Sequence, residues 1–491
     1  MNQENAVETT DYQSTHPIRH AETPAATLLL SISPSIMNSP TRLLLAALLL
    51  TPCSLLPAAD PSAAALAKGD GLHDLVANKV AAEYASLEAL YRDLHAHPEL
   101  SLMEVKTAAK IASELRAAGF AVTENFGGTG IVGVLKNGAG PTLLIRTDLD
   151  GLPVQEETGL PYASTTRVTS LSGQEVSVMQ ACGHDIHMTV FTGTARTLAA
   201  LKEHWSGTLV FIGQPAEEIG AGARAMLTAG LYRKFPRPDY AIAVHDSATL
   251  PAGTVGTVEG YIMANVDSMD ITVRGIGGHG AYPHTTKDPI VLAARIVGAL
   301  QTIVSRETRP VDPAVITVGS IHGGTKHNII PNEVKLQLTL RSYSDPVRLH
   351  TIEAIKRICR GEAIAAGLPD DLMPIVTLVG EQFTPATYNE PSLTRRIRGA
   401  LTNWLGADKV RTIDAEMGGE DFSEFGRTVE KVPLCLFRIG AVAPEKVAES
   451  ERTGVALPSL HSSKFAPVPE PTIKTGVTAL TAAALELLAK K

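Results

Sequence analysis

Cysteine is scarce in this chain, which has only four among 491 residues: Cys53, Cys182, Cys359 and Cys435. Their wide and irregular spacing offers no disulfide framework. Cys53 lies in a segment that we expect to be removed, which would leave three thiols. Because three is an odd number, at least one thiol is expected to do something other than pair with another cysteine.

An excess of positive charge is also missing, since 43 Lys and Arg face 51 Asp and Glu and the formal net charge is −8. With no basic run either, the sequence lacks the electrostatic footprint of a nucleic-acid-binding protein. Beyond the N-terminal leader, no apolar run approaches the roughly 20 residues that a spanning helix needs, so we expect no membrane span. What remains is an ordinary globular composition in a chain long enough for two or three domains of about 150 residues.

The first 67 residues have the pattern of a leader rather than of a folded domain. Met37 begins a better signal peptide than the first methionine, because a polar stretch precedes an apolar run at residues 43–50 and the A-x-A cleavage pattern Ala65-Leu66-Ala67 follows. We therefore predict a true start at Met37, cleavage near Ala67 and a periplasmic or secreted protein. A disordered tail or an amphipathic anchor is the alternative, and the proline before Cys53 disfavours lipidation there.

Apolar periodicity after the leader predicts an α/β architecture. Residues 72–97 and 104–118 have the spacing of amphipathic helices, which end at Pro98 and Gly119. Short apolar runs then alternate with helical segments, as in a largely parallel sheet with helices on both faces. The predicted strands are residues 142–146, 208–212 and 240–244, and the predicted helices are residues 186–201 and 221–229.

The pattern changes near residue 264. Apolar and polar residues alternate in two segments, most regularly at Val334, Leu336, Leu338 and Leu340. Such alternation is typical of antiparallel strands with one solvated side. We therefore predict a smaller α+β domain at residues 264–385, inserted into a larger domain formed by residues 68–263 and 386–491. Its predicted strands are residues 268–274, 334–341 and 373–381, and its predicted helices are residues 289–304 and 349–366.

Chemically capable side chains gather where the predicted strands of the larger domain end. Asp148 and Asp150 follow the first of these strands, Glu217 and Glu218 follow the second, and His245 follows the third. In open α/β sheets, ligands bind beyond the carboxyl ends of the strands. We therefore expect these side chains to share one site.

The sequence Cys182-Gly183-His184 lies in a loop that precedes a predicted helix. Such a pair can place a thiolate and an imidazole on one metal, and these ligands suit zinc and neighbouring transition metals. The alternative is a buried thiol with a capping histidine. A cysteine-protease nucleophile is disfavoured, because no local signature surrounds Cys182.

Glu217 and Glu218 are adjacent carboxylates, which repel each other unless cations neutralise them. One could bind a metal while the other takes a proton from a metal-activated water. The alternative is a solvated pair at a helix N-terminus. His245 and His461, taken singly, are more often core or surface histidines than ligands, and Asp148 could either orient a ligand from behind or serve as a turn residue.

A series of ordered motifs extends from about Leu87 to the C-terminus. They include Arg92-Asp93-Leu94-His95-Ala96-His97-Pro98-Glu99, Arg146-Thr147-Asp148-Leu149-Asp150-Gly151, Ala181-Cys182-Gly183-His184-Asp185-Ile186-His187, Gln214-Pro215-Ala216-Glu217-Glu218, Gly277-Gly278-His279-Gly280, Asn328-Ile329-Ile330-Pro331, Gly419-Glu420-Asp421-Phe422 and Leu460-His461-Ser462. Together they resemble the amidohydrolase branch of the di-metal aminoacylase and carboxypeptidase clan. That branch includes hippurate hydrolases, indole-acetyl-amino-acid hydrolases and N-acyl-amino-acid deacylases.

The resemblance implies a site with two divalent metal ions in the larger, catalytic domain. Zinc or manganese is favoured, and cobalt or nickel is compatible. The ligands implied by the motifs are Cys182, His184, Glu218, His245 and His461, with Asp148 behind them. Glu217 would act as general base and acid.

The inserted domain is implied to act as a lid and dimerisation domain in a homodimer. His279 would face the scissile carbonyl, either within one chain or across the dimer interface. Asn328 and Arg341 resemble a substrate-clamping pair, and an arginine suits a free α-carboxylate because it offers two parallel charge-assisted hydrogen bonds.

The activity that the resemblance implies is hydrolysis of an N-acyl or N-aroyl amino acid to a carboxylic acid and a free amino acid. A metallo-carboxypeptidase or dipeptidase on the same scaffold is the alternative. A non-catalytic binding relative is disfavoured, because all the implied ligands and the base are present. Three departures from the usual pattern, Gln180, Asp246 and the long loop at residues 164–178, leave the substrate preference open.

Overall fold

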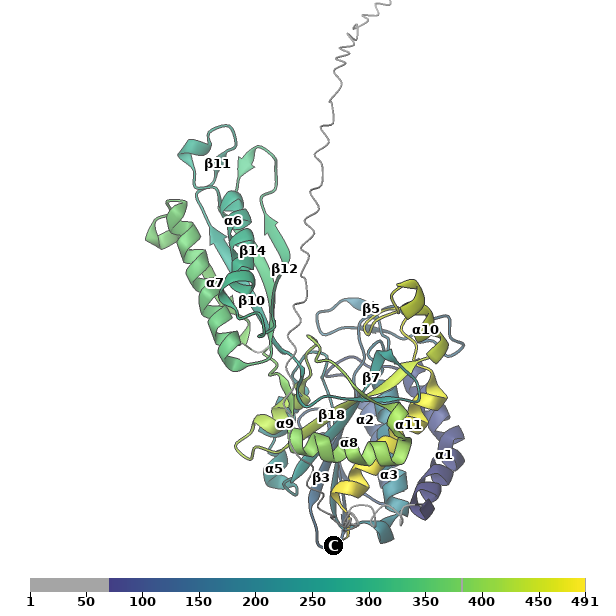
Figure 1. Ribbon diagram of the computed structural model, residues 1–491. Coiled ribbons are helices and arrows are strands. Elements are labelled where there is room, and N and C mark those ends of the chain that lie inside the picture. Colours follow the sequence, from purple (N-terminus) through teal and green to yellow (C-terminus); the bar gives the residue numbers. More distant parts are fainter. Residues whose placement is uncertain (1–69, 381–382, 491) are drawn as a thin grey trace, which may run out of the picture. The chain divides into compact units, whose positions relative to one another are not determined.

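The computed structural model describes residues 70–380 and 383–490 (Figure 1). The larger of its two main sheets is mixed and has eight strands. Its four central strands run parallel, whereas β2 and β8 lie antiparallel to the central strands beside them. The predicted fold class, with a largely parallel sheet, is confirmed. In spatial order the strands are β1 (Ala121–Thr123), β2 (Ile131–Asn137), β6 (Gly207–Gln214), β3 (Thr142–Asp148), β7 (Tyr240–Pro251), β18 (Leu434–Val442), β8 (Val255–Thr257) and β17 (Val410–Thr412).

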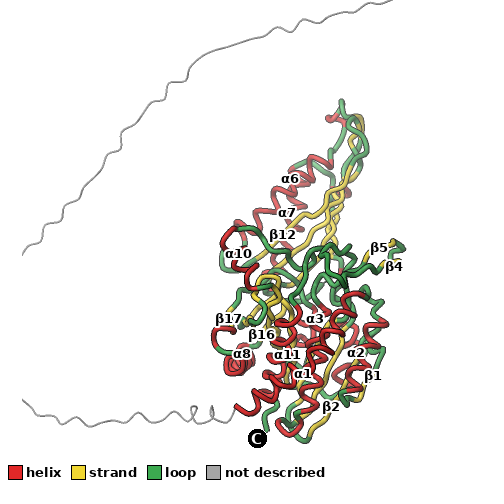
Figure 2. Tube along the Cα trace, turned by 90° about the vertical axis from the view of Figure 1, so that its right-hand side faces the viewer, coloured by secondary structure: helices red, strands yellow, loops and turns green. Residues whose placement is uncertain are grey.

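Helices cover both faces of this sheet. Consecutive residues of β3 belong to different hydrophobic clusters, so both faces are apolar and need to be covered. Leu143 and Ile145 belong to one hydrophobic cluster, whereas Leu144 between them belongs to another. Successive strand residues point to opposite faces, so each cluster marks one face. Figure 2 shows the helices packed around the strands. The first cluster includes α1 (Asp70–Ala96), α2 (Val105–Ala117), α3 (His184–Ala200), α8 (Pro391–Leu405) and α11 (Pro469–Leu487), and the second includes α4 (Gly222–Thr228), α5 (Leu231–Lys234) and α9 (Glu424–Arg427).

A second, four-stranded antiparallel sheet carries its own hydrophobic cluster. Along β14 the buried side chains are Val334, Leu336, Leu338 and Leu340, so the predicted alternation is confirmed. The strands in spatial order are β12 (Ala314–Gly323), β14 (Glu333–Ser342), β10 (Asn265–Arg274) and β15 (Ile375–Leu378), and the accompanying helices are α6 (Pro289–Thr302), α7 (Asp345–Ala365) and the short π-helical turn η4 (Ile303–Glu307).

By length and composition, one described segment, Pro289–Glu307, is apolar enough to cross a membrane. A single helix that passes this test is weak evidence of a membrane span, because core helices pass it too. The buried side of α6, with Leu292, Ile296 and Leu300, packs into the cluster of the second sheet. These contacts are those of a core helix, whose apolar composition passes the same test.

Both sheets belong to one compact unit of the chain. The predicted domain limits at residues 264–385 stay a prediction, and the predicted leader lies outside the described residues.

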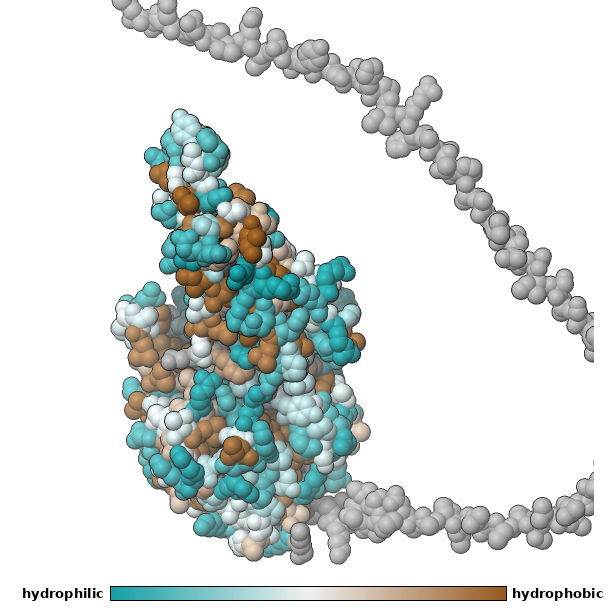
Figure 3. All heavy atoms as spheres, turned by 90° about the vertical axis from the view of Figure 1, so that its left-hand side faces the viewer, coloured by the Kyte–Doolittle hydropathy of each residue, from teal (hydrophilic) through white to brown (hydrophobic). Residues whose placement is uncertain are grey.

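The face of the molecule in Figure 3 shows hydrophobic residues in small groups between hydrophilic ones.

Candidate active site

The candidate site lies where the central strands of the large sheet end. Asp148, the last residue of β3, pairs with Gln214, the last residue of β6. Glu217 and Glu218 follow β6 within four residues, and His245 lies inside β7 on the other side of β3. The sheet therefore brings together residues that are almost 100 positions apart in the sequence.

The loop before α3 adds a thiol and an imidazole. Gly183, between Cys182 and His184, is the N-cap of α3 and has a left-handed backbone with φ of 76°. A Cβ atom at this position would lie 2.2 Å from Oδ2 of Asp246. Only glycine satisfies both the backbone conformation and the space, and the resulting turn places Cys182 and His184 beside the strand ends.

Cys182 is the common member of two groups of metal-binding side chains. Its Sγ lies 3.6 Å from Nε2 of His245 and 3.3 Å from Nε2 of His461. Nε2 of His461 lies 3.5 Å from Oε2 of Glu218, and Nε2 of His184 lies 3.6 Å from Oε1 of Glu218. The ligand atoms in each of the groups Cys182–His184–His245 and Cys182–Glu218–His461 lie within 4.8 Å of one another.

These donors fit the implied divalent ions. Nε2 of His184 and Oε1 of Glu218 are buried and have no hydrogen-bond partner among the described residues. A buried polar atom without a partner is rare, and a cation between these two atoms would satisfy both. Burial, together with the charge of Arg438, lowers the pKa of His245 to about 3, which leaves its imidazole neutral, as a metal ligand must be.

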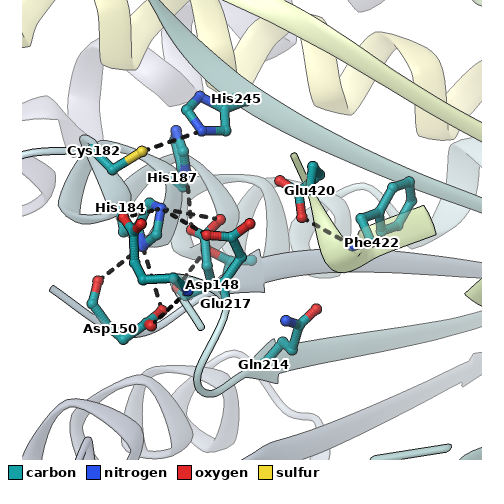
Figure 4. A network of polar contacts seen from close by, with 12 residues as sticks. Asp148, Asp150, Cys182, His184, His187, Gln214, Glu217, His245, Glu420 and Phe422 are labelled. Carbon is teal, nitrogen blue, oxygen red and sulfur yellow. Dashed lines mark hydrogen bonds and ion pairs between the residues drawn. The ribbon is translucent and has the colours of Figure 1, made fainter. Parts of the chain in front are cut away.

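A second layer of side chains orients the first. The carbonyl oxygen of Asp150 lies 2.8 Å from Nδ1 of His184, so that Nδ1 donates and Nε2 faces the cluster. His187 accepts the backbone N–H of Asp246 at Nε2 and lies 2.8 Å from Oδ1 of Asp148 at Nδ1. Figure 4 shows this network from close by, with Asp148, His184 and Glu217 pointing toward one another.

Asp148 is anchored by a buried guanidinium. Arg146 pairs with Asp148 and with Glu420, each at 2.7 Å, and it also hydrogen-bonds to Gln214 at 2.9 Å. All these groups are buried. The carboxylates beyond the strand ends are thus partly compensated by one cation even without a metal.

Among the described residues, no hydrogen bond holds the carboxylate of Glu217. Its Oε2 lies 3.9 Å from Nε2 of His184, and its side chain is 9% exposed. Burial and the nearby charges of Glu420 and Glu218 raise the pKa of Glu217 well above its usual range. A carboxylate with a raised pKa beside a metal cluster can take a proton and return it near neutral pH.

A cavity of about 560 Å³ opens onto this cluster. Arg341, from β14 of the second sheet, lines it together with Cys182, Glu217 and His461. Among the described residues Arg341 forms no ion pair, and its Nε donates to Oγ1 of Thr339 at 3.1 Å. An unpaired, half-buried guanidinium in a cavity is suited to a carboxylate of a ligand.

His279 and Asn328 do not line this cavity in the described part of the chain. His279 pairs with Ile329 in the small antiparallel sheet of β11 (Gly278–His279) and β13 (Ile329–Ile330), and the N–H of Gly280 donates to the carbonyl of Asn328 at 2.9 Å. Both side chains are exposed. The structure thus brings Arg341, but neither of these two residues, to the cavity of the same chain.

Several residues of the second layer were not predicted from the sequence. His187 follows His184 by three positions, and this helical spacing could have placed the two on one face of α3. Asp246 was noted only as a departure from the usual family motif, and its contact with His187 was not predicted. Arg438 is buried between the carbonyl of Asp246, 3.3 Å away, and Glu416, 2.6 Å away, and nothing in the local sequence indicates this position.

A mainly parallel sheet with a cysteine, histidine and carboxylate cluster at its strand ends is suited to a metal-dependent hydrolase. More particularly, the chain belongs to peptidase family M20/M25/M40, whose model matches residues 144–461. It is thus an enzyme of this family, a hydrolase that acts on amides.

Relatives with different activities match most of the chain. Thermostable carboxypeptidase 1 of Saccharolobus solfataricus is 35% identical over 392 residues, which are 79% of this chain and 92% of the relative. N-acetylcysteine deacetylase of Bacillus subtilis is 35% identical over 359 residues, which are 72% of this chain and 88% of the relative. The crystal structure of the Bacillus subtilis YXEP protein, described as a dinuclear metal binding peptidase from the M20 family, is 29% identical with a TM-score of 0.66 and covers 83% of this chain and 99% of its own.

Proposed function

We propose that this enzyme hydrolyses the amide bond of N-acyl or N-aroyl amino acids and releases a carboxylic acid and a free amino acid. The observation that carries the proposal is the shared cavity of Glu217, the metal-binding cluster and the unpaired Arg341. Glu217 can move a proton and the cluster can hold metal. Arg341 can recognise the carboxylate that every N-acyl amino acid retains.

Cys182, His184, Glu218, His245 and His461 would hold two divalent ions, of which zinc or manganese suits the donors best and cobalt or nickel is compatible. When bound, such ions polarise the amide carbonyl and lower the pKa of a water molecule toward neutrality. Glu217 takes a proton from the attacking water, whose hydroxyl goes to the acyl carbon. As the C–N bond breaks, Glu217 delivers the proton to the amine nitrogen.

Two further roles concern substrate orientation. Arg341 would clamp the α-carboxylate through two parallel hydrogen bonds. His279 would stabilise the developing oxyanion, and Asn328 would assist in holding the substrate. Because neither residue lines the cavity of its own chain, we assign both to a second copy of the enzyme in a homodimer formed through the inserted domain.

A carboxypeptidase or dipeptidase activity is the second candidate. It is favoured by the carboxypeptidase relative of Saccharolobus solfataricus, and it needs the same base and the same carboxylate clamp. The two candidates differ only in the acyl side of the scissile bond, where one has a simple acyl or aroyl group and the other has an amino acid or a peptide.

The experiment is metal analysis of the purified protein followed by a hydrolysis panel of hippurate, N-acetyl amino acids and dipeptides. We expect the N-acyl and N-aroyl amino acids to be cleaved fastest, with free amino acid released in step with the acid. Faster cleavage of dipeptides would favour the second candidate. Loss of activity on esterifying the substrate's α-carboxylate would test the role of Arg341 in both cases.

We also propose that the enzyme is exported, from the signal-peptide pattern that begins at Met37 and ends near Ala67. N-terminal sequencing of the protein from a cell fraction tests this. A first residue near position 68 in the exported fraction is expected, and retention of the residues before Ala65 in the mature protein would contradict it.

A further inference from the structure

Glu104 is a fully buried carboxylate that the chemistry described above does not use. It stands at the N-cap of α2, yet its side chain makes no capping hydrogen bond to that helix. Instead, Oε1 accepts the backbone N–H groups of Leu102 and Ala216, both at 2.8 Å. Oε2 accepts the hydroxyl of Thr129 at 2.7 Å.

The two residues held by Oε1 share an unusual backbone conformation. Leu102 has φ of 67° and Ala216 has φ of 51°, and both lie in the left-handed region that residues with a Cβ atom disfavour. Such conformations persist only where the surroundings hold them. One carboxylate oxygen therefore secures two strained positions that lie more than 100 residues apart.

Ala216 immediately precedes Glu217, and the other side of Glu217 is tethered too. The N–H of Glu218 donates to Oδ2 of Asp150 at 3.0 Å. The carbonyl of Ala216 accepts the N–H groups of Ala221 and Gly222 at 3.1 and 3.2 Å. Glu217 is thus the middle residue of a short segment whose backbone is fixed on both sides, while its own carboxylate faces the cavity.

We propose that Glu104 is a positioning residue for Glu217: its Oε1 holds Ala216 in the left-handed conformation that aims the carboxylate of Glu217 at the reacting centre. The inference rests on the proposed function, in which Glu217 moves the proton. Glu104 lies outside the residues that line the cavity, so it acts through the backbone and not on the substrate.

The first test compares Glu104→Ala with Glu104→Gln in the full-length enzyme at saturating metal. The glutamine retains an acceptor at Oε1, so kcat is expected to stay within about threefold, whereas the alanine lowers kcat about 10- to 100-fold with a smaller change in KM, as expected for a displaced catalytic group. Thr129→Val is the matched control, because it removes only the hydrogen bond to Oε2, and it should leave kcat unchanged. An unaltered kcat in folded Glu104→Ala overturns the proposal.

The second test separates positioning from general stability. Adding Ala216→Gly to Glu104→Ala should restore kcat about 10-fold, since glycine adopts the left-handed conformation without support. Adding Leu102→Gly relieves the other strained position and should raise the melting temperature without restoring kcat. Equal rescue of kcat by both glycines would assign Glu104 a merely structural role.

A third readout is independent of turnover. Hydrogen–deuterium exchange of the peptide that covers residues 213–222 should be faster in Glu104→Ala than in the parent and in Glu104→Gln. Wild-type exchange in this peptide would contradict the tether. If Glu217→Gln instead keeps full turnover, the base assignment fails while the exchange result still stands, so the two failures are distinguishable.

Discussion

The two sets of predicted site residues lie in very different surroundings. At the strand ends of the large sheet, Cys182, His184 and His245 are at most 6% exposed and face one another across less than 5 Å. His279 in β11 and Asn328 just before β13 are exposed and lie at the small two-stranded sheet that these strands form. The first set brings side chains that could hold a metal ion together within one chain, whereas the second set does not line the cavity.

This contrast indicates which part of the candidate site a single chain can assemble by itself. Buried ionisable groups cost free energy unless they are paired or bind metal, so a dense buried cluster marks a site that is already assembled. Exposed polar residues carry no such cost, and their function depends on what approaches them. Changes in the buried cluster should therefore have larger effects on turnover than changes in the exposed pair.

Removal of the metals should abolish turnover. Cys182→Ser replaces the thiol that is common to two ligand groups, and we expect metal content to fall by at least one ion per chain and activity to fall to background. Elemental analysis with an activity assay measures both. Cys359→Ala is the matched control, because this buried thiol belongs to the core of the second sheet, and it should leave the metal content unchanged. Full metal content in Cys182→Ser would contradict the ligand set.

Replacement of the base should leave the metals in place. Glu217→Gln keeps the shape of the side chain but removes its ability to accept a proton, so kcat should fall about 10²- to 10⁴-fold. Steady-state kinetics and metal analysis on the same sample test this. Glu175→Gln, on the exposed hairpin of β4 (Arg167–Thr169) and β5 (Glu175–Ser177), serves as the control. Near-normal turnover in Glu217→Gln would exclude it as the base.

His279→Ala should reduce kcat less, by about 10- to 100-fold, because one oxyanion donor is lost. Mixing this variant with Glu217→Gln under conditions that exchange subunits should restore roughly a quarter of the wild-type rate, since half of the dimers would then contain one intact site made from both chains. Sedimentation analysis establishes the oligomeric state. If the mixture gains no activity although mixed dimers form, His279 does not act across the interface.

The smallest expected effect concerns stability and pH. His95 is buried between Oδ2 of Asp185 at 2.6 Å and Oε1 of Glu156 at 3.0 Å. Burial alone would lower the pKa of His95, but the hydrogen bonds to these carboxylates outweigh it and raise the pKa to about 10. The stabilisation is therefore complete below the unfolded pKa of about 6.5 and is lost as the pH rises toward 10.

Chemical denaturation at several pH values tests this contribution. The wild-type free energy of unfolding should fall between pH 7 and pH 10 more steeply than that of His95→Gln. His97→Gln, at an exposed histidine on the same segment, should behave as the wild type. Equal slopes for all three proteins would contradict a protonated His95.

The sequence predicted local features better than long-range ones. The helix predicted at residues 72–97 is α1, Asp70–Ala96, and the alternation in β14 identified its buried side chains. The start of α3 was placed at residue 186 instead of His184, because the left-handed turn at Gly183 depends on space beside Asp246. Likewise β7 continues past Val244 to Pro251, since its pairing with β18 extends that far.

The candidate site shows the same limit. The five implied ligands could be named in advance because motif order and strand ends are visible in the sequence. The contacts of His187 with Asp246, of Arg438 with Glu416 and of Glu104 with Ala216 join segments 59, 22 and 112 residues apart, and no local pattern specifies them. Such partners are set by tertiary packing, which periodicity does not encode.

Gly183 has a consequence for anyone who would transplant this site into another scaffold. The loop that carries Cys182 and His184 is short enough to copy as a few residues, yet its turn requires glycine at position 183, because the carboxylate of Asp246 occupies the space where a side chain would stand. A graft that carries the loop without the end of β7 would lose Asp246, against which the loop packs. The smallest segment set that could be transferred is therefore the loop together with that strand end.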